Sequence, residues 1–251
     1  MAGTIAAFFV KQRKKAAKVI GAAYERSVGK ATTIVPASGA GDDADRILDE
    51  LDLSSWAALA DNVAPDYEIG FAEGGRQALV ELQIADEEMF GVVNETAADF
   101  AADRAAELVG KKWVDGKLVD NPNAEWAITE STRDGLRDLV ESALTDGLSP
   151  QSLRDAIEQS YQFSEARAET IARTELGFAH VQGAIEAWRV SDLVAGYEWE
   201  LGSEHDYEDE CDLNDGEYAD IGDDFPSGDD APPLHPNCVC SLLPVLKEEE
   251  E

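Results

Sequence analysis

Cysteine is scarce in this chain, with three residues among 251, and all three lie after residue 210. They cannot form a disulfide framework, because pairing any two leaves one thiol over. The sequence also lacks any run of the roughly 18 apolar residues that a transmembrane helix needs. The short apolar run at residues 5–10 precedes the nearby basic residues, whereas a secretory signal places the positive charge first. We therefore expect a protein that is intracellular when it is made and that does not contact a membrane.

Basic residues are also few: 20 Lys and Arg face 53 Asp and Glu, and the formal net charge is -33. This charge is far larger than solubility requires, and self-repulsion at low salt opposes folding. Because the screening length falls to about 3 Å at molar ionic strength, concentrated salt relieves that repulsion. The composition favours a halophilic host over the alternative, an acidic protein from an ordinary cell. The hydrophobic content of 44% is enough for a globular core.

Hydrophobic periodicity predicts a mainly α protein of α+β class, with a helical body and a small C-terminal β lobe closed by a Cys/His cluster. We expect a basic N-terminal arm and linker over residues 1–40 and the helical body over 41–190. The β lobe, with its zinc site, is expected over 191–246. The acidic residues 247–251 are expected to form a disordered tail.

Several residues mark helix ends in the body. Ser149 can accept a backbone N–H and Pro150 suits the first helical position, so a helix begins there, and Ser164 is expected to cap the next one. Gly110 and Gly147 are expected at helix C-termini. Small residues along the helix after Ser164 would let another helix approach closely: Ala168, Ala172, Ala179 and Gly183.

Three short segments indicate β structure. Asp115-Gly116 stands between apolar flanks, which predicts a tight hairpin turn. "YEWEL" at 197–201 alternates apolar and acidic residues, which is typical of a half-buried strand, and "CSLLPVL" at 240–246 is expected to form a second strand. The segment between them is rich in Asp, Gly and Pro and cannot form much hydrophobic core. It therefore needs a cross-link or a binding partner to become ordered.

The string "HPNCVC" at residues 235–240 concentrates a histidine and two cysteines next to the second strand. Tetrahedral zinc takes Cys and His ligands, and a structural ion would offset the ordering entropy of a segment with little core. The predicted zinc ligands are Cys211, His235, Cys238 and Cys240, with His205 and Glu208 in reserve. The alternative is that His235-Pro236 forms a turn and the cysteines are small buried hydrophobes, or that Cys211 pairs with one of the other two.

Catalytic motifs are missing from the sequence. The His-x-Glu and Pro-Cys-x-x-Cys strings of nucleobase deaminases do not occur, nor does the His-Glu-x-x-His of metalloproteases. No Gly-rich nucleotide loop with its lysine is present. We therefore expect no enzyme activity.

The first 30 residues hold seven basic residues and one acid, which makes a basic island in an acidic chain. Phosphates or an acidic partner surface would attract such a helix, while the plain alternative is a surface helix with ordinary lysines. The predicted contact residues are Lys11, Arg13, Lys14, Lys15 and Lys18. Farther along, Glu169 and Arg173 lie four apart and are expected to pair on a helix surface.

Taken together, the helices from residue 130, "ARTE" at 172–175, "YEWEL" and "HPNCVC" resemble the minor head protein family of tailed viruses, the group similar to the phage Mu F protein. The resemblance covers about residues 130–246. Many relatives carry Cys-x-x-Cys in the segment before His-Pro-x-Cys-x-Cys, whereas here only Cys211 remains. Arg173 and Glu175 match the family's Arg-Thr-Glu motif, which we interpret as an intramolecular or portal-facing salt-bridge element.

The resemblance implies a virion structural protein in the head near the portal, present in the host cytoplasm during assembly. It implies association with the portal protein, contact with the major capsid protein or packaged DNA through the basic arm, and help in head assembly and DNA packaging or delivery. The apolar residues Ile5, Phe8, Phe9 and Val10 are expected to insert into a portal groove, and the acidic composition suggests a virus of a halophilic archaeon. Alternatives are an injected DNA-binding or host-directed effector and a zinc-dependent enzyme.

Overall fold

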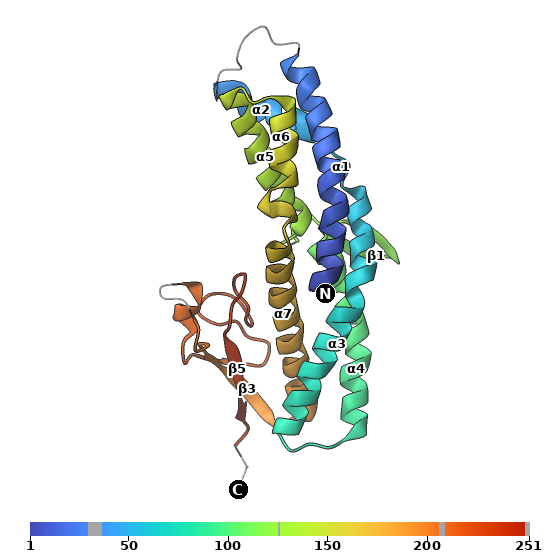
Figure 1. Cartoon of the computed structure of the whole chain (residues 1–251). Coiled ribbons are helices and arrows are strands. Elements are labelled where there is room, and N and C mark those ends of the chain that lie inside the picture. The colour runs from blue at the N-terminus through green and yellow to red at the C-terminus, as the bar shows by residue number, and fades with distance from the viewer. Residues whose placement is uncertain (30–36, 125, 206–208, 249–251) are drawn as a thin grey trace. The chain divides into compact units, whose positions relative to one another are not determined.

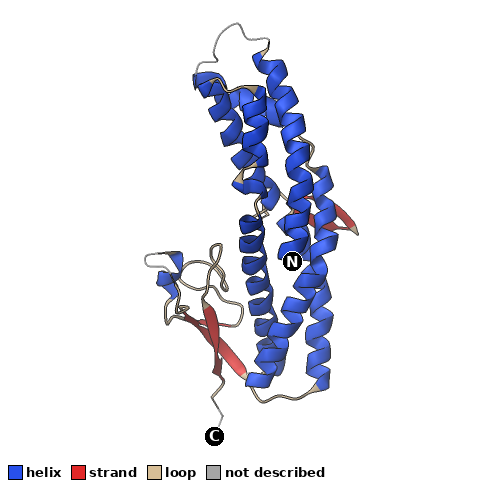
Figure 2. Cartoon of the chain, in the orientation of Figure 1, coloured by secondary structure: helices blue, strands red, loops and turns tan. Residues whose placement is uncertain are grey.

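A computed structural model describes residues 1–29, 37–124, 126–205 and 209–248 of the chain. Helices dominate it, and the described residues form two small antiparallel sheets (Figures 1 and 2), which confirms the predicted mainly α class with a small C-terminal β part. The chain divides into two compact units, Met1–Val63 with Ala105–Glu169, and Ala64–Arg104 with Thr170–Glu251.

The elements of the first unit are α1 (Ala2–Val28), α2 (Ala37–Leu48), β1 (Lys111–Val114), β2 (Lys117–Asp120), α5 (Ile128–Asp146) and α6 (Pro150–Glu158), with short 3-10 turns at Ser54–Trp56 and Tyr161–Phe163. Three long helices contribute residues to both units: α3 (Ala57–Glu81), α4 (Glu87–Leu108) and α7 (Glu165–Ser191). The second unit also holds β3 (Val194–Glu200), a 3-10 turn at Glu210–Asn214, β4 (Tyr218–Asp220) and β5 (Ser241–Leu246). The compact units therefore do not follow the predicted division at residues 40 and 190.

Helix α1 belongs to the core of the first unit and is not a free arm. Ile5 and Phe9 have no exposed surface, and the Phe9 ring lies 6.2 Å from Trp56 and 6.1 Å from Phe163, centroid to centroid. The Tyr24 hydroxyl lies 2.8 Å from the carbonyl oxygen of Leu148. The apolar residues recur every three to four positions, so a continuous stripe of α1 is buried. Residues 30–36 of the predicted linker and 249–251 of the predicted tail lie outside the described residues.

The predicted helix ends are confirmed. The Ser149 hydroxyl accepts the Ser152 backbone N–H at 3.0 Å, and the Ser164 hydroxyl accepts the backbone N–H of Arg167 at 3.0 Å. Gly147 follows α5 with φ +64°, a left-handed conformation that favours glycine.

The β1–β2 hairpin is also confirmed, with Trp113 opposite Leu118 in its register. Asp115 and Gly116 have φ values of +49° and +70°. Positive φ at both central residues is the mark of the type I′ turn that Asp-Gly favours, because its twist matches that of the strands.

Small residues bring α3 and α7 into close contact within the second unit. A Cβ at Gly183 would lie 1.9 Å from the carbonyl oxygen of Phe71, and one at Gly74 would lie 2.0 Å from that of His180. Only glycine fits at these distances, since any side chain would push the helices apart. The predicted close approach is confirmed at Gly183, and Gly74 is its counterpart on α3.

The β part of the second unit is a three-stranded antiparallel sheet in the order β4-β3-β5. Tyr197 and Trp199 of β3 are buried, as the alternating pattern predicts, and Trp199 is opposite Leu242. Phe225 covers both aromatic rings at centroid distances of 5.8 and 5.0 Å. Strand β4 was not predicted. None of the described helices has the length and hydropathy needed to cross a membrane.

Candidate metal centre

The three cysteines gather beside β5 and are all free thiols. Their candidate ligand atoms form two overlapping groups, His205 with Cys211 and Cys240, and Cys211 with His235 and Cys238, and within each group all ligand atoms lie within 4.8 Å of one another. Cys211 is common to both groups and is completely buried. The structure thus places the four predicted ligands and the reserve ligand His205 in two groups that share Cys211, and each group could hold a metal ion.

The spacing of the sulfur atoms suits a metal better than a disulfide. The Sγ atoms of Cys211 and Cys238 are 3.7 Å apart. A disulfide requires about 2.05 Å, whereas two thiolates about 2.3 Å from a tetrahedral zinc ion are separated by about 3.8 Å. The donor set fits zinc, although the reserve ligand Glu208 lies outside the described residues.

Both histidines are oriented by oxygen acceptors. His235 Nδ1 lies 3.1 Å from the carbonyl oxygen of Pro236, and His205 Nε2 lies 2.8 Å from Asp212 Oδ1. His235 Nε2 is buried and forms no hydrogen bond, although Asp209 Oδ2 lies 3.1 Å away at ion-pair distance. A metal-binding histidine is usually held through one nitrogen so that the other presents its lone pair to the ion. Both side chains meet that requirement.

Burial favours the neutral form of two of the three thiols, Cys211 and Cys240. It raises the pKa of Cys211 far above its usual value, and the neighbouring Cys238 and Cys240 raise it further. Burial also raises the pKa of Cys240, while a hydrogen bond from the Gly202 backbone lowers it. A neutral thiol is a poor nucleophile, so a cation is needed to convert this cluster into thiolates. The cluster is suited to binding a metal and unsuited to cysteine catalysis.

A hydrogen bond attaches the loop that carries Cys238 to α7. The Thr174 hydroxyl accepts the backbone N–H of Asn237 at 3.0 Å, and Asn237 has φ +62°. On the other side of the cluster, Asp209 Oδ1 accepts the backbone N–H of Cys211 at 2.8 Å. Neither of these two hydrogen bonds was predicted from the sequence. Thr174 lies inside the "ARTE" string, but nothing local indicates that its hydroxyl contacts a loop more than 60 residues away.

The two residues of the predicted salt-bridge motif have different surroundings. Glu175 is 3% exposed and accepts two hydrogen bonds from the guanidinium of Arg104, at 2.8 and 3.0 Å, and one from the Tyr67 hydroxyl at 2.8 Å. Arg173 is exposed. Two residues apart on a helix face different sides, so Glu175 forms an intramolecular salt bridge with Arg104 and not with Arg173. The expected surface pair of Glu169 with Arg173 is not formed among the described residues.

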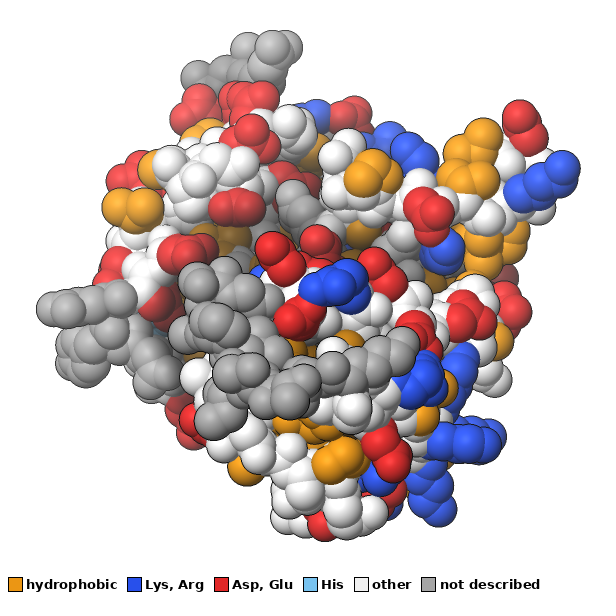
Figure 3. Space-filling view, turned by 90° about the horizontal axis from the view of Figure 1, so that it is seen from above, with side chains coloured by type: hydrophobic (Ala, Val, Ile, Leu, Met, Phe, Trp, Pro, Cys, Tyr) orange, Lys and Arg blue, Asp and Glu red, His pale blue; other side chains and the backbone are white. Residues whose placement is uncertain are grey.

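The basic residues of α1 do not form one uniform surface. Lys11, Lys14 and Lys18 are exposed, while Arg13 is half-buried. Lys15 is also half-buried, because its ammonium donates to the carbonyl oxygen of Asp52 at 2.7 Å. In Figure 3, Lys and Arg side chains gather toward one side of the view, and Asp and Glu side chains are spread over much of the rest. Three of the five predicted contact residues are therefore free to meet a partner.

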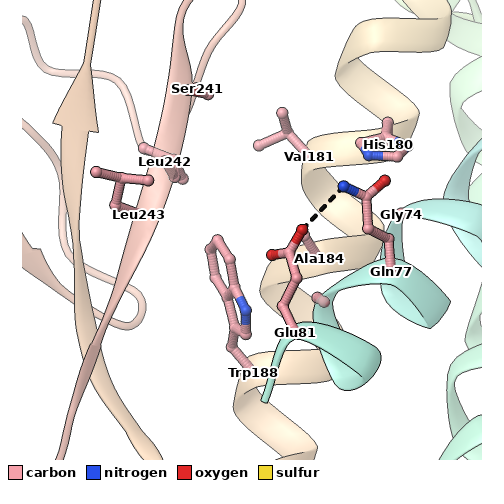
Figure 4. A pocket seen from close by; sticks show the side chains of 11 residues that line it. Gly74, Gln77, Glu81, His180, Val181, Ala184, Trp188, Ser241, Leu242 and Leu243 are labelled. Atoms are coloured by element: carbon pink, nitrogen blue, oxygen red, sulfur yellow. Dashed lines mark hydrogen bonds between the residues drawn. The ribbon is translucent and has the colours of Figure 1, made fainter. Parts of the chain in front are cut away.

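A cavity of about 240 Å³ lies elsewhere in the second unit, lined by α3, α7 and β5 (Figure 4). On α3, Gln77 donates to Glu81 at 2.9 Å, and His180 and Trp188 line the cavity together with Leu242. Its described lining contains a histidine and a carboxylate but no cysteine and no third metal-binding side chain. This cavity offers no recognisable catalytic arrangement.

The Cys/His cluster and the Thr174–Asn237 hydrogen bond fall inside a region similar to a known family. Residues 134–243, less than half of the chain, match the family model described as Phage Mu protein F like protein. Searches of curated proteins and of solved structures found no significant match. The matched region agrees with the resemblance seen in the sequence, which covers about residues 130–246.

Proposed function

We propose that this protein is a minor head protein of a tailed virus, which associates with the portal protein and assists head assembly and DNA packaging or delivery. The observation that carries the proposal is the match over residues 134–243, which includes both the "ARTE" and the "HPNCVC" strings. The hydrogen bond between Thr174 and Asn237 joins these strings in space, which gives both of them a structural role. On this proposal the protein acts in the virion head and passes through the host cytoplasm during assembly.

We assign the Cys/His cluster a structural zinc ion bound by the three cysteines and one histidine. Five nitrogen and sulfur donors lie in the two groups, one more than a tetrahedral ion uses. Catalytic zinc needs an open position for water, and surplus protein donors leave none. The donor set therefore favours a structural staple over a zinc-dependent enzyme. Metal analysis of the purified protein is expected to find zinc bound at one ion per chain, and chelation is expected to lower the stability of the β lobe.

The exposed lysines of α1 are the part of the basic helix that can contact the portal protein, the major capsid protein or packaged DNA. The idea that the apolar residues of α1 insert into a portal groove is wrong for Ile5 and Phe9, because both are completely buried in the protein's own core. The remaining proposal is an electrostatic contact through Lys11, Lys14 and Lys18. Molar salt weakens such a contact, which a virus of a halophilic archaeon would have to tolerate.

The decisive experiment is quantitative mass spectrometry of purified, DNA-filled heads after tail removal, scaled to the portal protein. A few copies for each portal ring are expected of a minor head component. Complete absence from the heads would contradict the proposal and favour an effector that acts in the host.

A charge-reversal variant tests the contact surface. Changing Lys11, Lys14 and Lys18 to Glu is expected to reduce incorporation into heads or the DNA content of the heads. Lys112 and Lys117 of the hairpin are also exposed, so their change to Glu is the control for added negative charge. Equal incorporation and equal DNA content in both variants would show that the lysines of α1 do not make the proposed contact.

A further inference from the structure

The centre contains two histidines but a tetrahedral ion bound by three thiolates has room for one. We infer that His205 is the fourth ligand, with Cys211, Cys238 and Cys240, and that His235 supports the site from outside the ligand shell. This inference rests on the proposed zinc binding. It replaces the histidine that adjacency in "HPNCVC" favours with one that lies 30 residues earlier in the chain.

The turn that carries His205 lies directly on the Cys-x-Cys segment. The backbone N–H of His205 donates to the carbonyl oxygen of Gly202 at 2.9 Å, which closes the turn. A Cβ at Gly202 would lie 2.2 Å from the carbonyl oxygen of Val239, so the two backbones touch and only glycine fits. The Gly202 backbone also forms a hydrogen bond with Cys240. These contacts hold His205 beside the sulfur of Cys240 before any ion binds.

The two histidines differ in how deeply their side chains are buried. The His205 side chain is 10% exposed, against 31% for His235. A closed structural site excludes water from its ligands, which favours the more buried ring. The Asp212 carboxylate, 2.8 Å from His205 Nε2, can accept a hydrogen bond from the Nε2–H group, and in that tautomer Nδ1 carries the free lone pair.

The distribution of ligands along the chain also favours His205. With His205, the ion takes two ligands from the segment after β3 and two from the segment before β5, so it joins both segments at two points. With His235, three of the four ligands come from one stretch of six residues, and Cys211 alone holds the other segment. The segment between residues 203 and 237 is rich in Asp, Gly and Pro, and the two-plus-two arrangement restricts it more.

His235 has a different role in this scheme. Its Nε2 lies 3.1 Å from Asp209 Oδ2, and Asp209 Oδ1 in turn accepts the backbone N–H of Cys211. His235 therefore lies at ion-pair distance from the carboxylate that caps the turn holding Cys211. The buried Nε2 of His235 forms no hydrogen bond, which makes His235 the competing ligand, so the experiment compares the two histidines directly.

The test measures zinc affinity by competition with a chromophoric chelator, and the absorption spectrum of the cobalt(II)-substituted protein, in three full-length variants. His205→Ala is expected to weaken zinc binding by more than about 100-fold, beyond the usual effect of losing an outer-shell partner, and to change the cobalt ligand-field bands. His235→Ala is expected to weaken binding by about 100-fold or less and to leave those bands unchanged. His180→Ala, which removes the third histidine of the chain from α7, is the control and should have no effect on either reading.

The reverse pattern, or equal losses in the His205 and His235 variants, would overturn the inference, and so would retention of zinc by both. The wild-type protein separates this failure from that of the proposed function. If the wild type binds no zinc, the proposed metal site itself is wrong. If it binds one ion and the His205→Ala variant keeps the same affinity and spectrum, only the assignment of His205 is wrong.

Discussion

The hydroxyl of Thr174 accepts a hydrogen bond from the backbone N–H of Asn237 at 3.0 Å and donates one to the carbonyl oxygen of Thr170 at 2.9 Å. Helix α7 and the loop of the metal centre are thereby joined at a residue next to Cys238. The conformation of that loop therefore depends on the Thr174 side chain. The helix that carries Thr174 is held in turn by the hydrogen bonds of the neighbouring Glu175.

Replacing Thr174 by Val removes the acceptor while keeping the shape of the side chain. We expect a loss of about 1 kcal/mol in the free energy of unfolding and zinc binding about 10-fold weaker, because the Asn237 N–H loses its partner and the Cys238 loop loosens. Urea unfolding and chelator competition measure the two effects. Thr145→Val is the matched control, since Thr145 makes the same bond to a carbonyl four residues earlier on α5 but accepts none from a loop in the described part of the chain. Equal effects in both variants would show that the contact with Asn237 contributes nothing.

The buried ion pair of Arg104 and Glu175 is expected to be sensitive to the loss of one partner. Glu175→Gln removes the negative charge that accepts two hydrogen bonds from the buried guanidinium of Arg104, and breaking a buried ion pair typically costs about 3–5 kcal/mol. The Arg104 side chain also covers the Phe178 ring at 4.6 Å, so it cannot easily move to solvent. Chemical denaturation measures the loss. Glu73→Gln on the exposed surface of α3, where Glu73 pairs with Arg76, is the control and should change stability little.

Stability is expected to fall at alkaline pH because of Tyr67. Burial raises the pKa of Tyr67 well above its usual value, and the nearby negative charge of Glu175 raises it further, while Arg104 opposes the rise. In the unfolded chain the phenol loses its proton near pH 10, whereas in the folded protein it keeps it. The folded state then binds more protons, so each pH unit above about 10 removes about 1.4 kcal/mol of stability until the folded pKa is reached.

Urea unfolding between pH 9 and 11 tests this dependence. Tyr67→Phe should be less stable at neutral pH, because Glu175 loses a hydrogen-bond donor, but its stability should fall less steeply above pH 10. Tyr24 also has a raised pKa, from burial, so a residual slope is expected in the variant. An unchanged slope in Tyr67→Phe would contradict the prediction.

The contact between α3 and α7 predicts opposite effects for two glycines of the same helix. Gly183→Ala places a Cβ where the carbonyl oxygen of Phe71 lies, so the helices must separate, at a cost of about 1–3 kcal/mol. Gly177→Ala meets no atom within 4 Å and should stabilise the helix by about 0.5–1 kcal/mol. Thermal unfolding of the two variants shows whether each substitution raises or lowers the stability of the protein. A gain in stability for Gly183→Ala would mean that the close packing of α3 and α7 is wrong.

Local signals predicted much of the fold. The caps at Ser149 and Ser164, the Asp-Gly turn of the hairpin and the alternation of β3 were all confirmed, because each depends on residues a few positions apart. The residues of the metal cluster were also predicted, since Cys and His are rare in this chain and concentrate near its end. The ligand set itself stays a prediction.

The sequence by itself therefore determined the helices, the strands flanking the acidic segment and the residue types that can bind a metal. Tertiary structure alone decided that α1 is part of a core, that Glu175 pairs with Arg104 and that His205 reaches Cys211 and Cys240. These relationships join residues far apart in the chain, and they depend on which backbones approach closely enough. Charge and hydropathy patterns indicate which residues need an interaction partner or burial. Tertiary packing determines which residue that partner is.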